Sequence, residues 1–249
     1  MIDIHNHILP GIDDGATDIE DSLNLLRLAI DDGITKLVCT PHMHAGRFDN
    51  DANSIQPVFE RLTDAVAKAD LPIKLAMAAE VRISDEFMIQ LKRQQVPFIG
   101  QWQGRQAVLL EMPHQNIPMG LDNLLNWLDR QEVQVIIAHP ERNKEIMRYP
   151  ERALKIAEKG VLFQVTAGSV AGRFGENAQT TARWLLDREC VDFMASDAHH
   201  VVRRPPAMKA ASKVLDEWFG VPLRERLTLT SPDILTGTLF NGHASGASQ

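Results

Sequence analysis

The 249-residue sequence predicts an α/β fold in which seven parallel strands form a closed or nearly closed barrel with helices outside. Seven short apolar segments alternate with segments whose apolar residues recur at helical spacing, the pattern of a parallel sheet covered by helices. Histidine or carboxylate residues follow six of the seven apolar segments. The carboxyl ends of barrel strands converge on one face, whereas the outer strands of an open sheet would lie too far apart to share a site.

Length and composition favour one domain over residues 1–242, followed by a small polar tail, 243–249, that we expect to fray. The hydrophobic content of 44% is ample for a large core, and the net charge of -7 without a basic block argues against nucleic acid as a partner. No apolar run long enough to enter a membrane and no signal sequence occurs. Cys39 and Cys190 lie in apolar segments, as buried thiols do, so we expect a cytoplasmic location.

The amino-terminal elements follow from local patterns. Ile2 and Ile4 alternate with polar residues, which indicates the first strand. Residues 17–20 have the spacing of a capping box at the start of a helix that Gly33 closes. The other expected strands are 36–40, 73–79, 107–110, 133–138, 161–165 and 191–195. The other expected helices are 55–69 with Ser54 as its cap, 84–95, 119–131, 150–159, 177–188, 207–219 and a short one after Ser231. Residues 101–106 are expected to be a connector, and 167–175 a glycine-rich loop.

Candidate metal ligands begin with His5 and His7, which point to the same face of an extended chain and so form a natural pair. The chain turns after them, and Asp13 and Asp14 follow as hard oxygen donors. The later strand ends supply His42, Glu80, Glu111, His139, Asp197 and His199.

Histidine and carboxylate without cysteine is a borderline-to-hard ligand set that suits zinc, manganese or iron. Glu80 and Glu111 end apolar strands, where an unpaired carboxylate is costly to bury and a cation removes the difficulty. A single tetrahedral site needs about four donors. The larger number of converging candidates therefore predicts two or three ions, with a carboxylate bridging two of them.

The motifs that carry these residues also carry a family resemblance. They are D-I-H-N-H-I-L-P-G-I-D-D-G, T-P-H, A-A-E, L-L-E, A-H-P-E-R, and S-D-A-H followed by R-P-P, in order over residues 3–206. The chain resembles the polymerase and histidinol phosphatase (PHP) superfamily, and within it the bacterial manganese-dependent protein-tyrosine phosphatases of capsule and exopolysaccharide operons.

This resemblance implies the PHP fold, a distorted TIM-like barrel of seven strands, and three divalent metal ions, with manganese expected and iron or zinc as alternatives. The implied ligand sets are His5, His7, Glu80 and Asp197 for the first ion; Glu80, Glu111 and His139 for the second; Asp14, His42 and His199 for the third. Arg142 and Arg204 match the phosphate-binding arginines of the family, and a planar guanidinium grips phosphate oxygens in bidentate fashion.

Several neighbours compete for these roles. Asp13 stands beside Asp14, His44 near His42, and Arg203 beside Arg204, while Arg142 has Glu141 and Glu145 as alternative partners. His114 is expected in a loop or on the surface. The candidates for the phosphotyrosine entrance, all in loops after strand ends, are Arg47, Phe48, Arg173 and Phe174.

The expected activity is hydrolysis of phosphotyrosine by a metal-activated hydroxide that attacks phosphorus in line with the leaving oxygen. The sequence argues against a phosphocysteine route, because the positions six after Cys39 and Cys190 are Ala45 and Ser196 rather than arginine. The resemblance implies as partner the tyrosine-rich tail of a membrane-associated kinase that controls polysaccharide export. The alternatives are a PHP phosphoesterase acting on a small ester such as histidinol phosphate, and a non-catalytic scaffold. The oligomeric state stays open.

Overall fold

The computed structural model describes residues 1–241, and the predicted tail 243–249 lies outside this range. The strands are β1 (Ile2–Asp3), β2 (Lys36–Cys39), β3 (His42–Met43), β4 (Lys74–Met77), β5 (Glu80–Arg82), β6 (Gln101–Trp102), β7 (Arg105–Glu111), β8 (Val133–Ala138), β9 (Leu162–Thr166) and β10 (Phe193–Ala195). The α-helices are α1 (Ile19–Asp31), α2 (Ala52–Lys68), α3 (Asp85–Lys92), α4 (Leu121–Arg130), α5 (Lys144–Arg148), α6 (Glu151–Ala157), α7 (Ala167–Val170), α8 (Glu176–Asp187), α9 (Met208–Phe219), α10 (Val221–Glu225) and α11 (Ser231–Asn241). Short 3₁₀ and π turns occupy Pro140–Arg142 and Arg226–Thr230.

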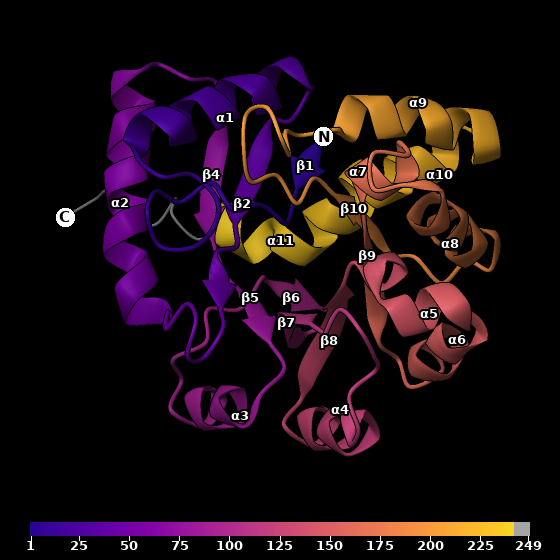
Figure 1. Cartoon of the computed structure of the whole chain (residues 1–249). Coiled ribbons are helices and arrows are strands. Elements are labelled where there is room, and N and C mark those ends of the chain that lie inside the picture. The colour runs from indigo at the N-terminus through magenta and orange to yellow at the C-terminus, as the bar shows by residue number, and fades with distance from the viewer. Residues whose placement is uncertain (242–249) are drawn as a thin grey trace.

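The strands form two sheets, in the orders β1-β2-β4 and β10-β9-β8-β7-β5-β3, and the helices surround them (Figure 1). Every pair is parallel except β6 with β7. The two sheets meet beyond β1 and β10, where Asn6 and Ala198 form an isolated parallel bridge. The predicted parallel α/β fold is confirmed. The strands do not form one closed barrel, since they divide into two sheets, so the structure has the nearly closed form.

Two of the predicted strands, 36–40 and 73–79, are each followed by a further short strand that was not predicted. Strand β3 follows β2 after Pro41, which has no N–H to continue a ladder. Strand β5 follows β4 after residues 78–79, so that Glu80 begins a short strand beside His42 instead of following one. Strands β3 and β5 belong to the sheet of β7, whereas β2 and β4 belong to the sheet of β1, so the chain changes sheet after β2 and again after β4.

Other differences are local. Asp18 rather than Thr17 caps α1, and Asp51 rather than Ser54 caps α2 in a capping box in which Ser54 is the third helical residue. The predicted connector 101–106 is a hairpin of β6 and β7, because its central residues Gln103 and Gly104 both adopt positive φ (50° and 82°), as in a type I′ turn. The predicted loop 167–175 begins with the helical turn α7.

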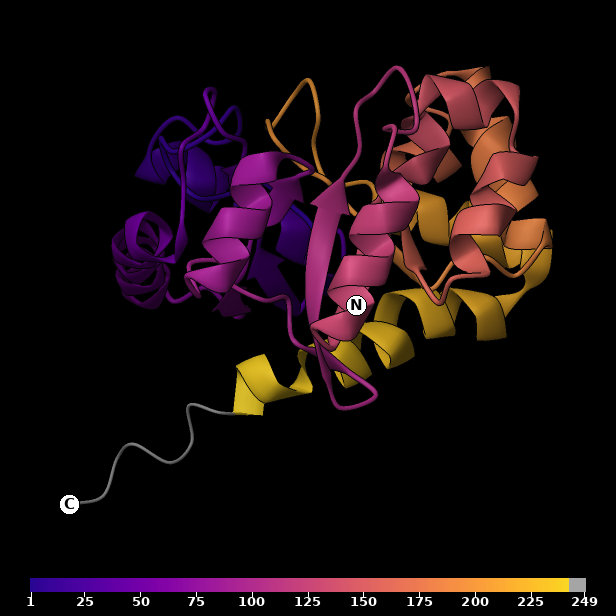
Figure 2. The same ribbon diagram turned by 90° about the horizontal axis from the view of Figure 1, so that it is seen from below.

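Helix α11 covers one end of the strands, and the loops that follow the strands lie at the other end (Figure 2). Leu235 is fully buried, and Leu239 and Phe240 pack with it against apolar residues of the strands, such as Ile2 and Leu109. A larger apolar cluster fills the space between the strands and the surrounding helices. The apolar residues thus fill the end of the strands that α11 covers and the space beneath the helices. Among the helices of residues 1–241, none has the length and apolar character needed to cross a bilayer.

Candidate metal centre

His5 and His7 lie side by side just beyond β1, fully buried, with ring centroids 5.5 Å apart. Nδ1 of His5 is 2.6 Å from Oε1 of Gln164, and Nδ1 of His7 is 2.7 Å from Oδ2 of Asp13. Because both partner oxygens are acceptors, each Nδ1 carries the proton and donates it. Nε2 of both rings is therefore left with a free lone pair, as a metal ligand requires.

These two Nε2 atoms face Glu80 and Asp197. Each lies 3.3 Å from Oε2 of Glu80, and they lie 3.5 and 3.4 Å from Oδ1 of Asp197. Ligands at 2.0–2.2 Å from one tetrahedral ion are roughly 3.3–3.6 Å from each other. Both Nε2 atoms and Oε2 of Glu80 are buried without any hydrogen-bond partner. A divalent cation between them would satisfy all three, so this donor set fits a metal ion.

A second group lies toward the open side of the site. Oδ1 of Asp14 is 3.4 Å from Nε2 of His42 and 3.6 Å from Nε2 of His199. These three residues and His7 offer ligand atoms within 4.8 Å of one another. Nδ1 of His42 is another buried candidate ligand atom without a hydrogen-bond partner.

Glu80 joins the remaining donors. Its Oε1 lies 2.8 Å from Nε2 of His139, and its Oε2 lies 2.9 Å from Nδ1 of His42. Glu111 falls in one donor group with Glu80 and His42, while His139 falls in another with His5 and Asp197. The structure thus brings all nine sequence-predicted ligands together, with Glu80 at their centre. It groups Glu111 with His42, a pairing that the family resemblance does not imply.

The backbone at two of these positions is unusual. His139 has a φ of 35° and Asp197 a φ of 51°, in the left-handed region that side chains rarely adopt. Short hydrogen bonds hold them there: the His139 amide donates to the Gln164 carbonyl at 2.7 Å, and the Asp197 amide donates to the His5 carbonyl at 2.7 Å. Such strained residues persist only where the surroundings fix them, typically at functional sites.

The electrostatics of the centre favour bound cations. Burial opposes ionisation of Asp197, but the Arg204 guanidinium and His5 hold the pKa of its carboxyl well below the usual range. Burial disfavours the charged form of His42, yet the Glu80 carboxylate outweighs it and raises the His42 pKa to about 9. Burial lowers the pKa of His199 to about 3. The centre therefore combines the ionised Asp197 carboxylate with a neutral imidazole at His199 and with an imidazole at His42 whose proton a metal cation would replace.

The two predicted phosphate-binding arginines meet at Asp197. Nη1 of Arg142 lies 2.5 Å from Oδ2 of Asp197, and Nη2 of Arg204 donates to the same oxygen. Nη1 of Arg204 lies 3.2 Å from Nε2 of His199. Arg142 does not pair with either alternative acid, since Glu141 accepts from Thr166 and Ser169 while Glu145 pairs with Arg152. Arg203 is exposed and takes no part.

The centre opens into a cavity of about 130 Å³. Arg47 lies at its rim, 3.3 Å from Oδ2 of Asp14, and Phe48 stacks on His42 with ring centroids 5.5 Å apart. His44 and His114 also line the cavity; His114 is exposed, as predicted, but stacks near His139 at 6.3 Å.

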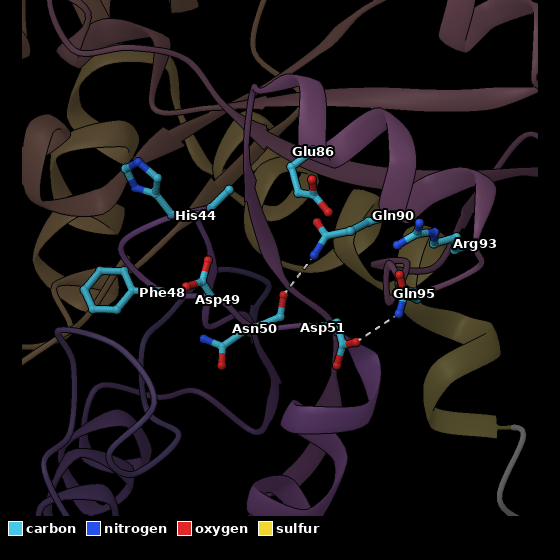
Figure 3. A pocket seen from close by; sticks show the side chains of 10 residues that line it. His44, Phe48, Asp49, Asn50, Asp51, Glu86, Gln90, Arg93 and Gln95 are labelled. Atoms are coloured by element: carbon cyan, nitrogen blue, oxygen red, sulfur yellow. Dashed lines mark hydrogen bonds between the residues drawn. The ribbon is translucent and has the colours of Figure 1, made fainter.

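A second hollow of about 360 Å³ lies beside this cavity, between residues 44–51 and helix α3 (Figure 3). His44 lines both spaces. The Gln90 amide donates to the backbone carbonyl of Asn50 at 3.3 Å, and the Gln95 amide donates to Asp51 at 3.2 Å, so the walls of the hollow are tied together. Its lining is mainly polar and includes the acidic residues Asp49, Asp51 and Glu86 as well as the basic residue Arg93.

Some supporting residues were not identified from the sequence. Gln164 lies on β9, the strand that ends without a ligand, and orients His5. Asp3 is fully buried and accepts hydrogen bonds from the Ser196 hydroxyl and amide at 2.6 and 2.9 Å, which join β1 to the end of β10. The available signal was a polar side chain inside an apolar strand segment, because such a group needs a buried partner.

Comparison with known proteins agrees with this geometry. A family model described as capsular polysaccharide synthesis, CpsB/CapC, matches residues 1–236. Tyrosine-protein phosphatase YwqE of Bacillus subtilis is 35% identical over 228 residues, which cover 92% of this chain and 89% of that protein. Tyrosine-protein phosphatase CpsB of Streptococcus pneumoniae is 26% identical over 240 residues, covering 93% of this chain and 96% of that one.

Solved structures give the same result. A chain from the crystal structures of YwqE and CpsB, metal-dependent tyrosine phosphatases, has a TM-score of 0.88 at 33% identity and covers 95% of this chain and 94% of its own. The lactonase Lmo2620 of Listeria monocytogenes has a TM-score of 0.55 at 12% identity over 94% of each chain, which shows a shared fold alone. The resemblance noted from the motifs is confirmed, and the chain belongs to the CpsB/CapC family of capsular polysaccharide synthesis.

Proposed function

We propose that this protein is a metal-dependent protein-tyrosine phosphatase. The observation that carries the proposal is the convergence of buried, unpartnered imidazole and carboxylate atoms with two arginines at the open end of the strands. Three divalent ions, manganese by preference and iron or zinc as alternatives, would be held by His5, His7, Asp14, His42, Glu80, Glu111, His139, Asp197 and His199.

When bound, such ions would lower the pKa of a coordinated water towards about 7 and would neutralise phosphate charge. The chain's own contribution is to position the phosphate. The guanidinium groups of Arg142 and Arg204 share Oδ2 of Asp197, and a phosphate dianion in the cavity offers oxygens that compete for the same N–H donors. Two guanidinium groups on the equatorial oxygens would stabilise the charge that spreads over them in the transition state.

The leaving group also favours tyrosine. A phenol has an ordinary pKa of about 10, so the departing tyrosine oxygen is a better leaving group than a serine alkoxide. The hollow beside the cavity supports a polypeptide substrate, since it offers polar walls to the residues that flank the phosphotyrosine. In keeping with the family, the proposed substrate is the tyrosine-rich tail of a membrane-associated bacterial kinase, and the reaction is placed in the cytoplasm, where the free thiols of Cys39 and Cys190 persist.

The test is turnover of a phosphotyrosine peptide by protein treated with a chelator and then supplied with manganese. We expect chelation to abolish turnover and manganese to restore it, and Arg204→Ala to lose about 100-fold or more in kcat/KM. Full activity after verified removal of metal would overturn the proposal. Histidinol phosphate and a phosphoserine peptide serve as competing substrates, and faster turnover of histidinol phosphate would favour the small-ester alternative.

A further inference from the structure

The aromatic ring of Phe174 lies against both arginines of the site. The guanidinium carbon of Arg142 is 4.7 Å from the ring centroid, and that of Arg204 is 5.3 Å away. An aromatic ring attracts a cation placed within about 6 Å of its centroid. Since the same two guanidinium groups also share Oδ2 of Asp197, the pair is held between one carboxylate oxygen and one aromatic ring.

The position of Phe174 is built into the loop after α7. The Arg173 amide donates to the Gly168 carbonyl at 2.8 Å, and Gly172 and Gly175 adopt φ values of 77° and 88° that favour glycine. A Cβ atom at Gly168 would come within 2.6 Å of Cε2 of Phe174. The ring therefore rests on a surface that exists only because residue 168 has no side chain.

Glu141 connects this platform to Arg142. Its carboxylate is fully buried, and Oε1 accepts from the Thr166 amide at 2.9 Å and from the Ser169 hydroxyl at 2.7 Å. Ser169 belongs to α7, whereas Glu141 directly precedes Arg142 in the chain. The segment that carries one guanidinium is thus fixed to the helix that supports the ring.

We propose that Phe174 is a positioning residue that holds Arg142 and Arg204 as one phosphate-binding unit. The inference rests on the proposed function, because it specifies how that site binds its phosphate. It predicts that the ring affects affinity for any phosphate group, aromatic or not. A ring that instead stacked on the phosphotyrosine would affect aromatic esters alone.

The test measures binding of inorganic phosphate to the metal-loaded protein by calorimetry, beside KM and kcat for a phosphotyrosine peptide. Phe174→Leu should weaken phosphate binding about tenfold and raise KM in parallel, as expected for two lost cation–aromatic contacts. Phe174→Tyr should restore wild-type affinity because it keeps the ring. Gly168→Ala should reproduce the loss by displacing the ring, which provides a second route should Phe174→Leu fold poorly.

Tyr149 offers a matched control. Its ring also lies against two arginines, Arg148 and Arg152, each at 5.2 Å. These arginines do not line the cavity, unlike Arg142 and Arg204, so Tyr149→Leu should leave phosphate affinity unchanged. Unchanged phosphate affinity in folded Phe174→Leu and Gly168→Ala would overturn the inference, as would a raised KM without weaker phosphate binding. Failure of the proposed function would show instead as a wild-type protein that binds phosphate but does not hydrolyse phosphotyrosine.

Discussion

Oδ2 of Asp13 lies 2.7 Å from Nδ1 of His7, and it also accepts the backbone amide of His42 at 3.1 Å. Asp13 therefore orients one candidate ligand and fixes the chain at another. Asp14, next to it, faces His42 and His199 from the open side instead. The two adjacent acids, which the sequence alone leaves in competition, have separate places in the structure.

Replacing Asp13 with alanine should weaken metal binding by about 10- to 100-fold, because a histidine ligand loses the acceptor that fixes its ring and tautomer. Calorimetric titration of the metal-free protein with manganese measures the dissociation constant. The control is Asp122→Ala, which removes an exposed side chain outside the centre and should leave manganese affinity unchanged. Equal affinities for the two variants would mean that Asp13 does no more than stabilise the turn.

Much of this centre could be predicted because histidine and carboxylate residues, which are the usual metal ligands, follow most of the apolar strand segments in the sequence. His5 and His7 share a face by simple alternation along an extended chain, and the structure places them together. The strand breaks could not be foreseen from hydrophobic periodicity. Glu80 follows an apolar run like the other ligands, yet it begins a separate strand that pairs with β3.

The supporting contacts were harder to predict for a different reason. Gln164 and His5 are 159 positions apart, and their hydrogen bond depends on strand order and register, which no local pattern encodes. The helix caps illustrate the same limit at short range. Both Thr17 and Asp18 can cap a helix, and the structure uses Asp18, whose side chain accepts the Asp21 amide.

Gly15→Ala should disrupt the site through the backbone. A Cβ at this position would lie 1.8 Å from the carbonyl oxygen of His7, a contact that only movement of the turn can relieve. The turn carries both Asp13 and Asp14, so we expect weaker manganese binding together with a lower melting temperature. Calorimetric titration and thermal unfolding of the variant measure both effects. Gly104→Ala tests a glycine whose Cβ would meet nothing but whose φ of 82° disfavours a side chain. It should lower the melting temperature while leaving metal binding intact.

Metal binding should raise thermal stability, because ions that bind only the folded state stabilise it. At 100 times the dissociation constant, one site contributes about 2.7 kcal/mol, which corresponds to roughly 5–10 °C for a chain of this size. Thermal unfolding with and without manganese measures the shift. His7→Ala removes a residue that lies in two of the candidate groups, so its shift should be much smaller. An equal shift in His7→Ala would place the stabilising ion elsewhere.

A pH effect independent of the metal centre is expected at Asp192. Its Oδ2 accepts the Phe163 amide at 2.9 Å at the start of β9. Burial raises the pKa of this carboxyl to about 6, against the opposing effects of that hydrogen bond and of Arg226. Between the unfolded pKa, about 3.9, and 6, the folded state binds more protons than the unfolded state. The carboxyl is therefore favourable to folding when protonated and destabilising once it ionises above pH 6.

Asp192→Asn should consequently stabilise the protein at pH 8 by about 1–2 kcal/mol, after allowance for solvent screening of a partly buried group. The asparagine oxygen can still accept the Phe163 amide, so the two proteins should have similar stability near pH 4, where Asp192 is protonated. Denaturant unfolding of both proteins across pH 4–8 isolates this residue, because every other titrating group is common to the pair. A stability difference that stays constant across the range would mean that the Asp192 pKa is not raised on folding.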